Sequence, residues 1–161
     1  MNVLVVSCHP LEDSFTAHVR TRVLAVLSEP HEVRHLDLYT EAVGLDRTDQ
    51  LAWAEALVLV YPTWWSSQPA ALVDWVDDCW GARPRYPKLR RIVVVTSHGS
   101  SWPVNAIEGE VGRRIVMRGL RGRAHPRCRR QWISLYSIDR AGEARRRRFV
   151  ERMERRLARL G

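Results

Sequence analysis

Val3-Leu4-Val5-Val6-Ser7 forms a compact apolar run near the start of the chain, and a polar loop from Cys8 to Asp13 follows it. An apolar run of this length without alternation is typical of a strand that is buried on both faces of a sheet. Residues 14–28 then carry apolar side chains at helical spacing, with Asp13 as a candidate N-cap. The chain therefore begins with a strand, a loop and a helix, which is the repeating unit of an α/β protein.

The same alternation continues to the C-terminus. Strands are predicted at residues 3–7, 31–38, 57–61, 92–96 and 132–136, and helices at 14–28, 48–54, 70–80, 109–120 and 140–160. Pro62 is expected to end the third strand, and a loop from His98 to Pro103 to follow the fourth. Strands that alternate with helices predict a parallel sheet with right-handed crossovers and helices on both faces. At 161 residues the chain is expected to form a single domain, residues 1–161.

The composition predicts a protein of a reducing compartment without a membrane span. Apolar residues make up 45% of the chain but fall in short runs, and no basic leader precedes the first run. The cysteines Cys8, Cys79 and Cys128 form no C-x-x-C pair, so we expect neither disulfides nor a metal site. Cys8 ends a buried strand and is interpreted as a core residue rather than a reactive thiolate. A cytoplasmic location is the resulting expectation.

The net charge of +8 is concentrated in the last third of the chain, where residues 113–161 carry 17 Arg and 4 acidic residues. Such asymmetry can mark a surface for nucleic acid or for membranes. No nucleic-acid reading motif accompanies the charge, so nucleic-acid binding is the weakest hypothesis and is not predicted. A solvated face, or an anionic ligand or partner, is favoured instead.

The loop after the first strand leads into the N-terminus of a helix, where a phosphate would bind well. Unpaired backbone N–H groups and the helix dipole favour an anion at this place. The side chains of His9, Ser14 and Thr16 could add hydrogen-bond donors. Glu12 and Asp13 would repel a phosphate unless they point away from it. An ordinary capped turn explains this loop equally well.

The loops after the third and fourth strands add aromatic and polar groups. Tyr61-Pro62-Thr63-Trp64-Trp65-Ser66-Ser67-Gln68-Pro69 has two adjacent tryptophans between two prolines. At least one of them is expected to line a surface, and an aromatic wall beside amides and hydroxyls suits a flat heterocycle. A dimer interface rich in tryptophan would explain the pair as well. In the next loop, Thr96 to Pro103, Gly99 permits close backbone approach. A lone loop histidine such as His98 is more often a surface residue than a catalyst.

Taken together, these segments resemble the NAD(P)H:quinone oxidoreductase family of flavodoxin-like proteins. His9-Pro10 with Ser14-Phe15 resembles the family's motif for the flavin phosphate. Tyr61-Pro62-Thr63-Trp64-Trp65, followed by Pro69-Ala70, resembles its segment along the flavin ring, and Thr96-Ser97-His98-Gly99 takes the place of its third flavin loop. The resemblance implies a flavodoxin-like three-layer α/β sandwich, with a five-stranded parallel sheet in the order 2-1-3-4-5 and helices on both faces.

The same resemblance implies a function. The protein would bind FMN, or FAD, take a hydride from NAD(P)H and pass two electrons to a small quinone-like acceptor, with the site at a homodimer interface. The implied flavin-binding residues are His9, Ser14, Phe15, Thr16, Pro62, Thr63, Trp64, Trp65, Ser66, Ser97, His98, Gly99 and Ser100. Trp65 and Trp102 would line the substrate pocket. For a proton donor, the candidates are His98 and solvent.

Two alternatives stay open. Ser66-Ser67-Gln68 stands where the family commonly has an aromatic residue and a glycine, so the acceptor pocket could be narrower. A flavin enzyme dedicated to one biosynthetic metabolite is therefore the first alternative. The second is a flavodoxin-like binding or regulatory protein that has lost flavin. A one-electron carrier is disfavoured, because the basic C-terminal third would suit few of the partners that acidic carriers meet.

Overall fold

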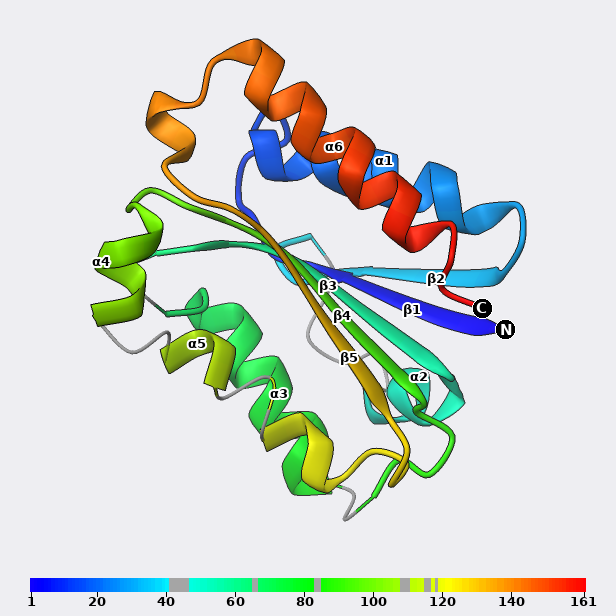
Figure 1. The fold of residues 1–161 in the computed structure, drawn as a ribbon. Coiled ribbons are helices and arrows are strands. Elements are labelled where there is room, and N and C mark those ends of the chain that lie inside the picture. Colours follow the sequence, from blue (N-terminus) through cyan, green and yellow to red (C-terminus); the bar gives the residue numbers. More distant parts are fainter. Residues whose placement is uncertain (41–46, 65–66, 83–84, 108–110, 115–116, 118) are drawn as a thin grey trace.

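Five parallel strands form one sheet in the order β2-β1-β3-β4-β5, as predicted. The structure is a computed structural model and describes residues 1–40, 47–64, 67–82, 85–107, 111–114, 117 and 119–161. The strands are β1 (Asn2–Ser7), β2 (Glu32–Asp37), β3 (Ala56–Thr63), β4 (Arg91–His98) and β5 (Arg129–Leu135). Because all five run in the same direction, their C-terminal ends lie at one edge of the sheet, which is the left-hand side of Figure 1.

Helices lie on both faces of this sheet (Figure 1). They are α1 (Phe15–Ser28), α2 (Arg47–Trp53), α3 (Ala70–Ala82), α4 (Trp102–Ile107), α5 (Val111–Arg114) and α6 (Glu143–Leu157). The helix predicted at 109–120 is seen only in part, as α5 and a short 3-10 turn at Leu120–Gly122; residues 108–110, 115–116 and 118 lie outside the described residues. None of the described helices is both long enough and apolar enough to span a bilayer.

Each face of the sheet has its own hydrophobic core. On β1, Val3 and Val5 pack with the apolar sides of α1 and α6, whereas Leu4 and Val6 pack with those of α2 and α3. All four side chains are fully buried or nearly so. This double burial explains why the sequence shows continuous apolar runs rather than an alternating pattern.

The structure corrects three local predictions: the N-cap of α1, the length of the loop after β4 and, as described below, the end of β3. Ser14, not Asp13, caps α1, since its Oγ accepts a hydrogen bond from the N–H of Ala17 at 3.1 Å. The expected loop after β4 is shorter than predicted, because α4 begins at Trp102. Pro103 then lies in the first turn of this helix, where its missing N–H is not needed.

Pro62 does not end the third strand, because β3 continues to Thr63. The carbonyl of Val60 accepts a hydrogen bond from the N–H of Cys8 at 3.0 Å, so Val60 and every second residue after it face β1. β1 itself ends at Ser7, opposite Val60. The nitrogen of Pro62 therefore points to a place that β1 no longer occupies, and the strand tolerates the proline.

Candidate functional site

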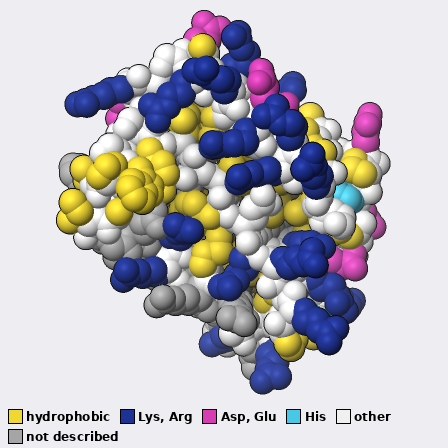
Figure 2. All heavy atoms as spheres, viewed as in Figure 1, with side chains coloured by type: hydrophobic (Ala, Val, Ile, Leu, Met, Phe, Trp, Pro, Cys, Tyr) yellow, Lys and Arg dark blue, Asp and Glu magenta, His cyan; other side chains and the backbone are white. Residues whose placement is uncertain are grey.

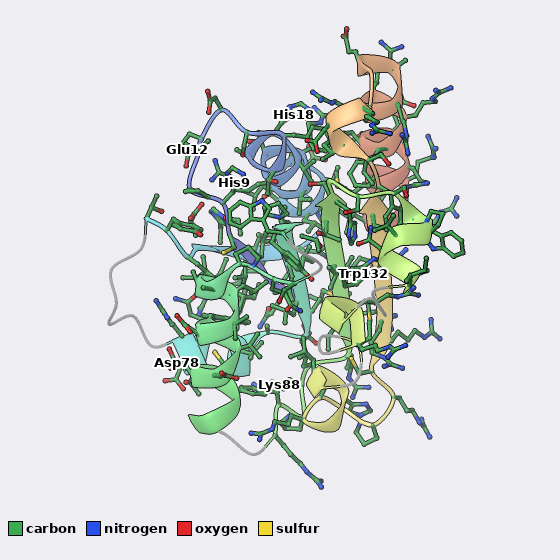
Figure 3. The ribbon with its side chains drawn as sticks, turned by 90° about the vertical axis from the view of Figure 1, so that its left-hand side faces the viewer. His9, Glu12, His18, Asp78, Lys88 and Trp132 are labelled. Atoms are coloured by element: carbon green, nitrogen blue, oxygen red, sulfur yellow. The ribbon has the colours of Figure 1, made fainter. Side chains whose placement is uncertain are left out.

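The three loops singled out above lie together at the C-terminal edge of the sheet (Figure 1). The His9 ring, from the loop after β1, meets the Trp64 ring, from the loop after β3, edge to face, with ring centroids 5.7 Å apart and planes inclined by 62°. The ends of β3 and β4 are joined by a hydrogen bond of 2.9 Å between the hydroxyls of Thr63 and Thr96. Figure 3 shows His9 and Glu12 in the same loop, just ahead of α1.

The N-terminus of α1 brings together the groups that the sequence assigns to a phosphate. Ser14 uses one lone pair to cap the helix and keeps its hydroxyl proton for a ligand. Phe15 is half-buried and Thr16 is buried beside Ser97 and Thr96, where they line a cavity of about 10 Å³. A cavity of this size holds one water molecule at most. A phosphate would therefore bind outside it, at the open end of the helix.

An ion-pair network turns the acidic side chain of Glu12 toward a cation. Arg20 contacts both Glu12 carboxylate oxygens, at 2.6 and 3.3 Å, and donates to Oδ2 of the buried Asp37 at 2.8 Å. The hydrogen bond from Arg20 holds the pKa of Glu12 below its usual value. Glu12 is thus paired with the guanidinium of Arg20 on α1. This pairing neutralises one of the two carboxylates, Glu12 and Asp13, that the sequence predicts to repel a phosphate.

The same network reaches into the sheet. The Ser7 hydroxyl donates to Oδ2 of Asp37 at 2.9 Å, and Nε2 of His35 lies 2.9 Å from the Ser7 oxygen. Ser7 has one proton to give, so His35 acts as the donor in that contact. Burial lowers the pKa of His35 and so favours the neutral ring, which donates through Nε2 in this contact. Arg20 and Asp37 were not predicted as part of the site; β2 mixes charged and apolar residues, so the acidic residue at its end gave no distinct signal.

The loop after β3 is closed by backbone hydrogen bonds. Trp64 and Ser67 exchange two of them, of 3.1 and 2.9 Å, and the Trp64 side chain is 41% exposed. Gln68 is buried and donates through Nε2 to the carbonyl of Gly112 at 2.8 Å, so it ties this loop to α5. Pro62 is buried and Thr63 half-buried. Trp65 and Ser66, which were also predicted to bind flavin, lie outside the described residues.

The loop after β4 is anchored by His98. Its ring is 5% exposed, lies 2.9 Å from Oδ1 of Asn105 through Nδ1, and stacks on the Tyr136 ring with centroids 4.5 Å apart. Because the Asn105 amide nitrogen donates to the carbonyl of Ser101, its oxygen accepts, and Nδ1 of His98 carries a proton. His98 therefore connects β4, α4 and the end of β5, a set of contacts typical of a positioning residue.

The rest of this loop is open to solvent. Gly99 and Ser100 are exposed, while Ser97 is buried. A Cβ at Gly99 would lie 3.1 Å from Oδ2 of Asp139, so a side chain there would crowd this carboxylate. Trp102, at the start of α4, is 58% exposed. The exposed backbone of the loop is available to the polar edge of a ligand.

His98→Ala is expected to lower the free energy of unfolding by about 2–3 kcal/mol, because it leaves the buried Asn105 oxygen without its donor and removes a stacked ring. Urea denaturation followed by circular dichroism measures the change. The exposed Ser100→Ala is the control, with an expected change below about 0.5 kcal/mol. Equal stability of the two variants would contradict this anchoring role, and unchanged turnover in His98→Ala would exclude His98 as a proton donor.

The three cysteines are expected to differ in their reactivity toward an alkylating reagent. Burial raises the pKa of Cys8 to about 12, so only about one thiol in ten thousand is ionised at pH 8. Cys79 is also buried, whereas Cys128 is partly exposed. Iodoacetamide in native buffer should therefore modify Cys128 first, and all three cysteines in denaturant. Peptide mapping that found Cys8 modified before Cys128 would contradict the interpretation of Cys8 as an inert core residue.

Comparison with known proteins agrees with this geometry. The family described as "Flavodoxin-like fold" matches residues 1–102. The chain belongs to this flavodoxin-like family. A search of curated protein sequences finds no match to the chain. The family assignment rests on the part of the flavodoxin-like chain that runs from β1 to the first residue of α4, and this part includes all three loops.

Solved structures at low sequence identity share the fold of this flavodoxin-like protein. Smu.1420 from Streptococcus mutans superimposes with a TM-score of 0.83 at 21% identity, over 98% of this chain and 99% of that one. An NAD(P)H:quinone oxidoreductase from Methanothermobacter marburgensis gives 0.80 at 21%, over 99% and 96%. An FMN-dependent NADH-azoreductase from Bacillus anthracis, solved with FMN, gives 0.81 at 15%, over 99% and 98%. The predicted resemblance is thereby confirmed, and at these identities the likeness establishes the fold.

Proposed function

We propose that this protein binds FMN across the three loops and uses it to pass two electrons from NAD(P)H to a small quinone-like acceptor. The observation that carries the proposal is the meeting of a capped helix N-terminus, a half-exposed tryptophan and an open polar loop at one edge of the sheet. FAD is the alternative cofactor. The named activities of the structural relatives, quinone and azo reduction, support the same reaction class.

The donor set fits a flavin phosphate. The first amides of α1 and the hydroxyl of Ser14 would hold the phosphate, with His9 beside it. Arg20 keeps the Glu12 carboxylate engaged, so one of the two acids that precede this helix end is neutralised by a cation. Thr16 is largely buried and would support the helix end from below rather than enclose the ligand.

The aromatic and backbone groups would hold the ring. Trp64 offers a half-exposed face next to Pro62 and Thr63, and the exposed residues Gly99 and Ser100 would border the ring from the loop after β4. When bound, FMN supplies the hydride chemistry, and the protein positions the ring and sets its electronic environment. Backbone N–H groups of the open loop would stabilise negative charge on the reduced ring. A proton for the acceptor would come from solvent or from His98.

A second copy of the chain would complete the site. Trp102, Val104 and Ile107 of α4 are exposed, Ile107 by 87%. Figure 2 shows hydrophobic side chains gathered on the left, where Figure 1 places α4. Patches of this kind mark interaction sites. We infer that a homodimer buries the patch next to the flavin. Sedimentation equilibrium measures the mass, and a monomer at all concentrations would contradict the inference.

The decisive experiment is the visible spectrum of the purified protein after FMN has been added and the excess removed by gel filtration. Retained flavin bands that bleach with NADH or NADPH, and return with a benzoquinone, are expected. Trp64→Ala should retain less flavin, whereas Trp53→Ala, which removes a tryptophan from α2 on the other side of the protein, should retain as much as the wild type. A folded wild-type protein that retains neither FMN nor FAD would overturn the proposal and favour a binding or regulatory role.

A further inference from the structure

The outer strand β5 and the last helix α6 enclose a groove that the proposed flavin site does not use. The groove has a volume of about 560 Å³, and its floor includes the buried side chains of Leu135 and Phe149. One wall consists of Arg145, Arg148, Arg152 and Arg155 of α6, with Glu151 as the acidic residue among them. Figure 2 shows Lys and Arg side chains gathered over α6 and the adjoining sheet edge, with few acidic ones between them.

The arginines form a stripe rather than a scattered surface charge. Their spacing of three, four and three residues places all four on one side of α6. At 1.5 Å per residue, the stripe from Arg145 to Arg155 is about 15 Å long. All four side chains belong to exposed residues. Within the part of the chain that the structure describes, none of them forms an ion pair with a carboxylate.

The four arginines share one acidic neighbour in the groove, Glu151, and one of the four, Arg152, is partly desolvated. Arg152 lies over the Phe149 ring, 5.6 Å from its centroid, and donates to the carbonyl of Ser134 in β5 at 3.1 Å. Burial, with a further contribution from the neighbouring Arg156, lowers the pKa of Arg152. An anion placed in the groove would reduce the repulsion between Arg152 and the neighbouring positive charges. Guanidinium groups bind carboxylates with two parallel hydrogen bonds, so a carboxylate is a suitable anion.

The opposite wall belongs to the edge of the sheet. β5 is the last strand of the sheet, and on one side it has no neighbouring strand among the described residues. The groove reaches this strand at Ser134 and Leu135. The carbonyl of Ser134 already accepts a hydrogen bond from Arg152, so an extended chain would pair with the other backbone groups of this edge. An extended segment of five residues is about 16 Å long, which matches the arginine stripe.

We propose that the groove between β5 and α6 binds an acidic, extended segment of a partner protein, whose carboxylates pair with Arg145, Arg148 and Arg155. An edge strand, an apolar floor and a line of arginines together fit a polypeptide with alternating acidic and apolar side chains. A nucleic-acid backbone would use the arginines but neither the strand edge nor the apolar floor. The proposal is independent of flavin binding.

The test measures fluorescence anisotropy of a labelled peptide, Glu-Val-Glu-Leu-Asp-Val-Glu, titrated with the protein at low salt. Micromolar binding is expected, falling as salt rises. Arg148→Glu/Arg155→Glu should weaken it at least tenfold. The matched control is Arg147→Glu/Arg85→Glu, which removes the same net charge from exposed positions outside the groove and should change binding less than threefold. Equal weakening by both double variants would overturn the proposal.

Competing occupants are separated in the same assay. An oligothymidylate of equal charge, or vesicles of phosphatidylcholine with phosphatidylserine, should bind the wild type at least tenfold more weakly than the peptide. Tighter binding of either would assign the groove to a phosphate backbone or a membrane and overturn the proposal. Hydrogen exchange of the unmodified protein provides a check that needs no variant: the peptide should protect amides of 129–137, and unchanged exchange there would also overturn it.

Discussion

Arg20→Ala is expected to weaken FMN binding at least tenfold and to lower the free energy of unfolding by about 2 kcal/mol. The loss of affinity follows from the release of the Glu12 carboxylate near the N-terminus of α1, where it would repel the phosphate. The loss of stability follows from Asp37, which stays buried without its cation. Isothermal titration with FMN and urea denaturation measure the two effects separately.

A second substitution distinguishes the two consequences. In Arg20→Ala/Glu12→Gln the released side chain is neutral, so FMN affinity should recover to within about threefold of the wild type while the stability stays low. Arg22→Ala is the control on the same helix, because its ion pair with Glu154 lies at the surface and contributes at most about 1 kcal/mol. Failure of Glu12→Gln to restore binding would show that Glu12 does not control the phosphate site.

Trp75→Ala is expected to lower the free energy of unfolding by about 3–5 kcal/mol, the largest effect predicted for a single site in this protein. Trp75 is fully buried on α3, in the core between this helix and the sheet. Removing the indole leaves a cavity that the closely packed neighbours cannot fill. Because the substitution removes a fluorophore, the urea transition should be followed by far-ultraviolet circular dichroism.

Two other tryptophan variants calibrate this result. At protein concentrations low enough for the monomer, Trp102→Ala removes a side chain of the same size from an exposed position and should change stability by less than about 1 kcal/mol. Trp75→Phe keeps most of the buried volume and should lose less than half as much as Trp75→Ala. Similar stabilities for Trp75→Ala and Trp102→Ala would mean that the α3 core contributes far less than its burial indicates.

The sequence was sufficient to predict the strands because both faces of the sheet are covered. A strand such as β4, with only buried residues from Ile92 to His98, leaves an apolar run that no surface helix would show. The ends of the strands were less predictable than their positions in the chain. Pro62 predicts the end of a strand because a proline is unfavourable in a central strand, and only the length of the neighbouring β1 shows why it is tolerated.

The site was predictable to the level of its loops and no further. The common direction of the strands places the loops beginning at Cys8, Trp64 and Gly99 at one edge, and this direction follows from the alternation of strands and helices. The partners of individual side chains do not follow, because Arg20 and Asp37 are separated by 17 residues and meet only after β2 has paired with β1. The burial of His98 was likewise hidden, since Asn105 and Tyr136 come from different elements.

The proline in β3 has a consequence for where a ligand can enter. In the order β2-β1-β3-β4-β5 the chain leaves β1 toward one side and later continues from β3 toward the other, so the connections diverge between these two strands. Ligands of open α/β sheets bind at this divergence. The chain after Ser7 is held to β3 by the hydrogen bond from the N–H of Cys8 to the carbonyl of Val60. Pro62 has no N–H to donate the next bond toward this side, so the pairing between the two strands stops at the divergence where a ligand would enter.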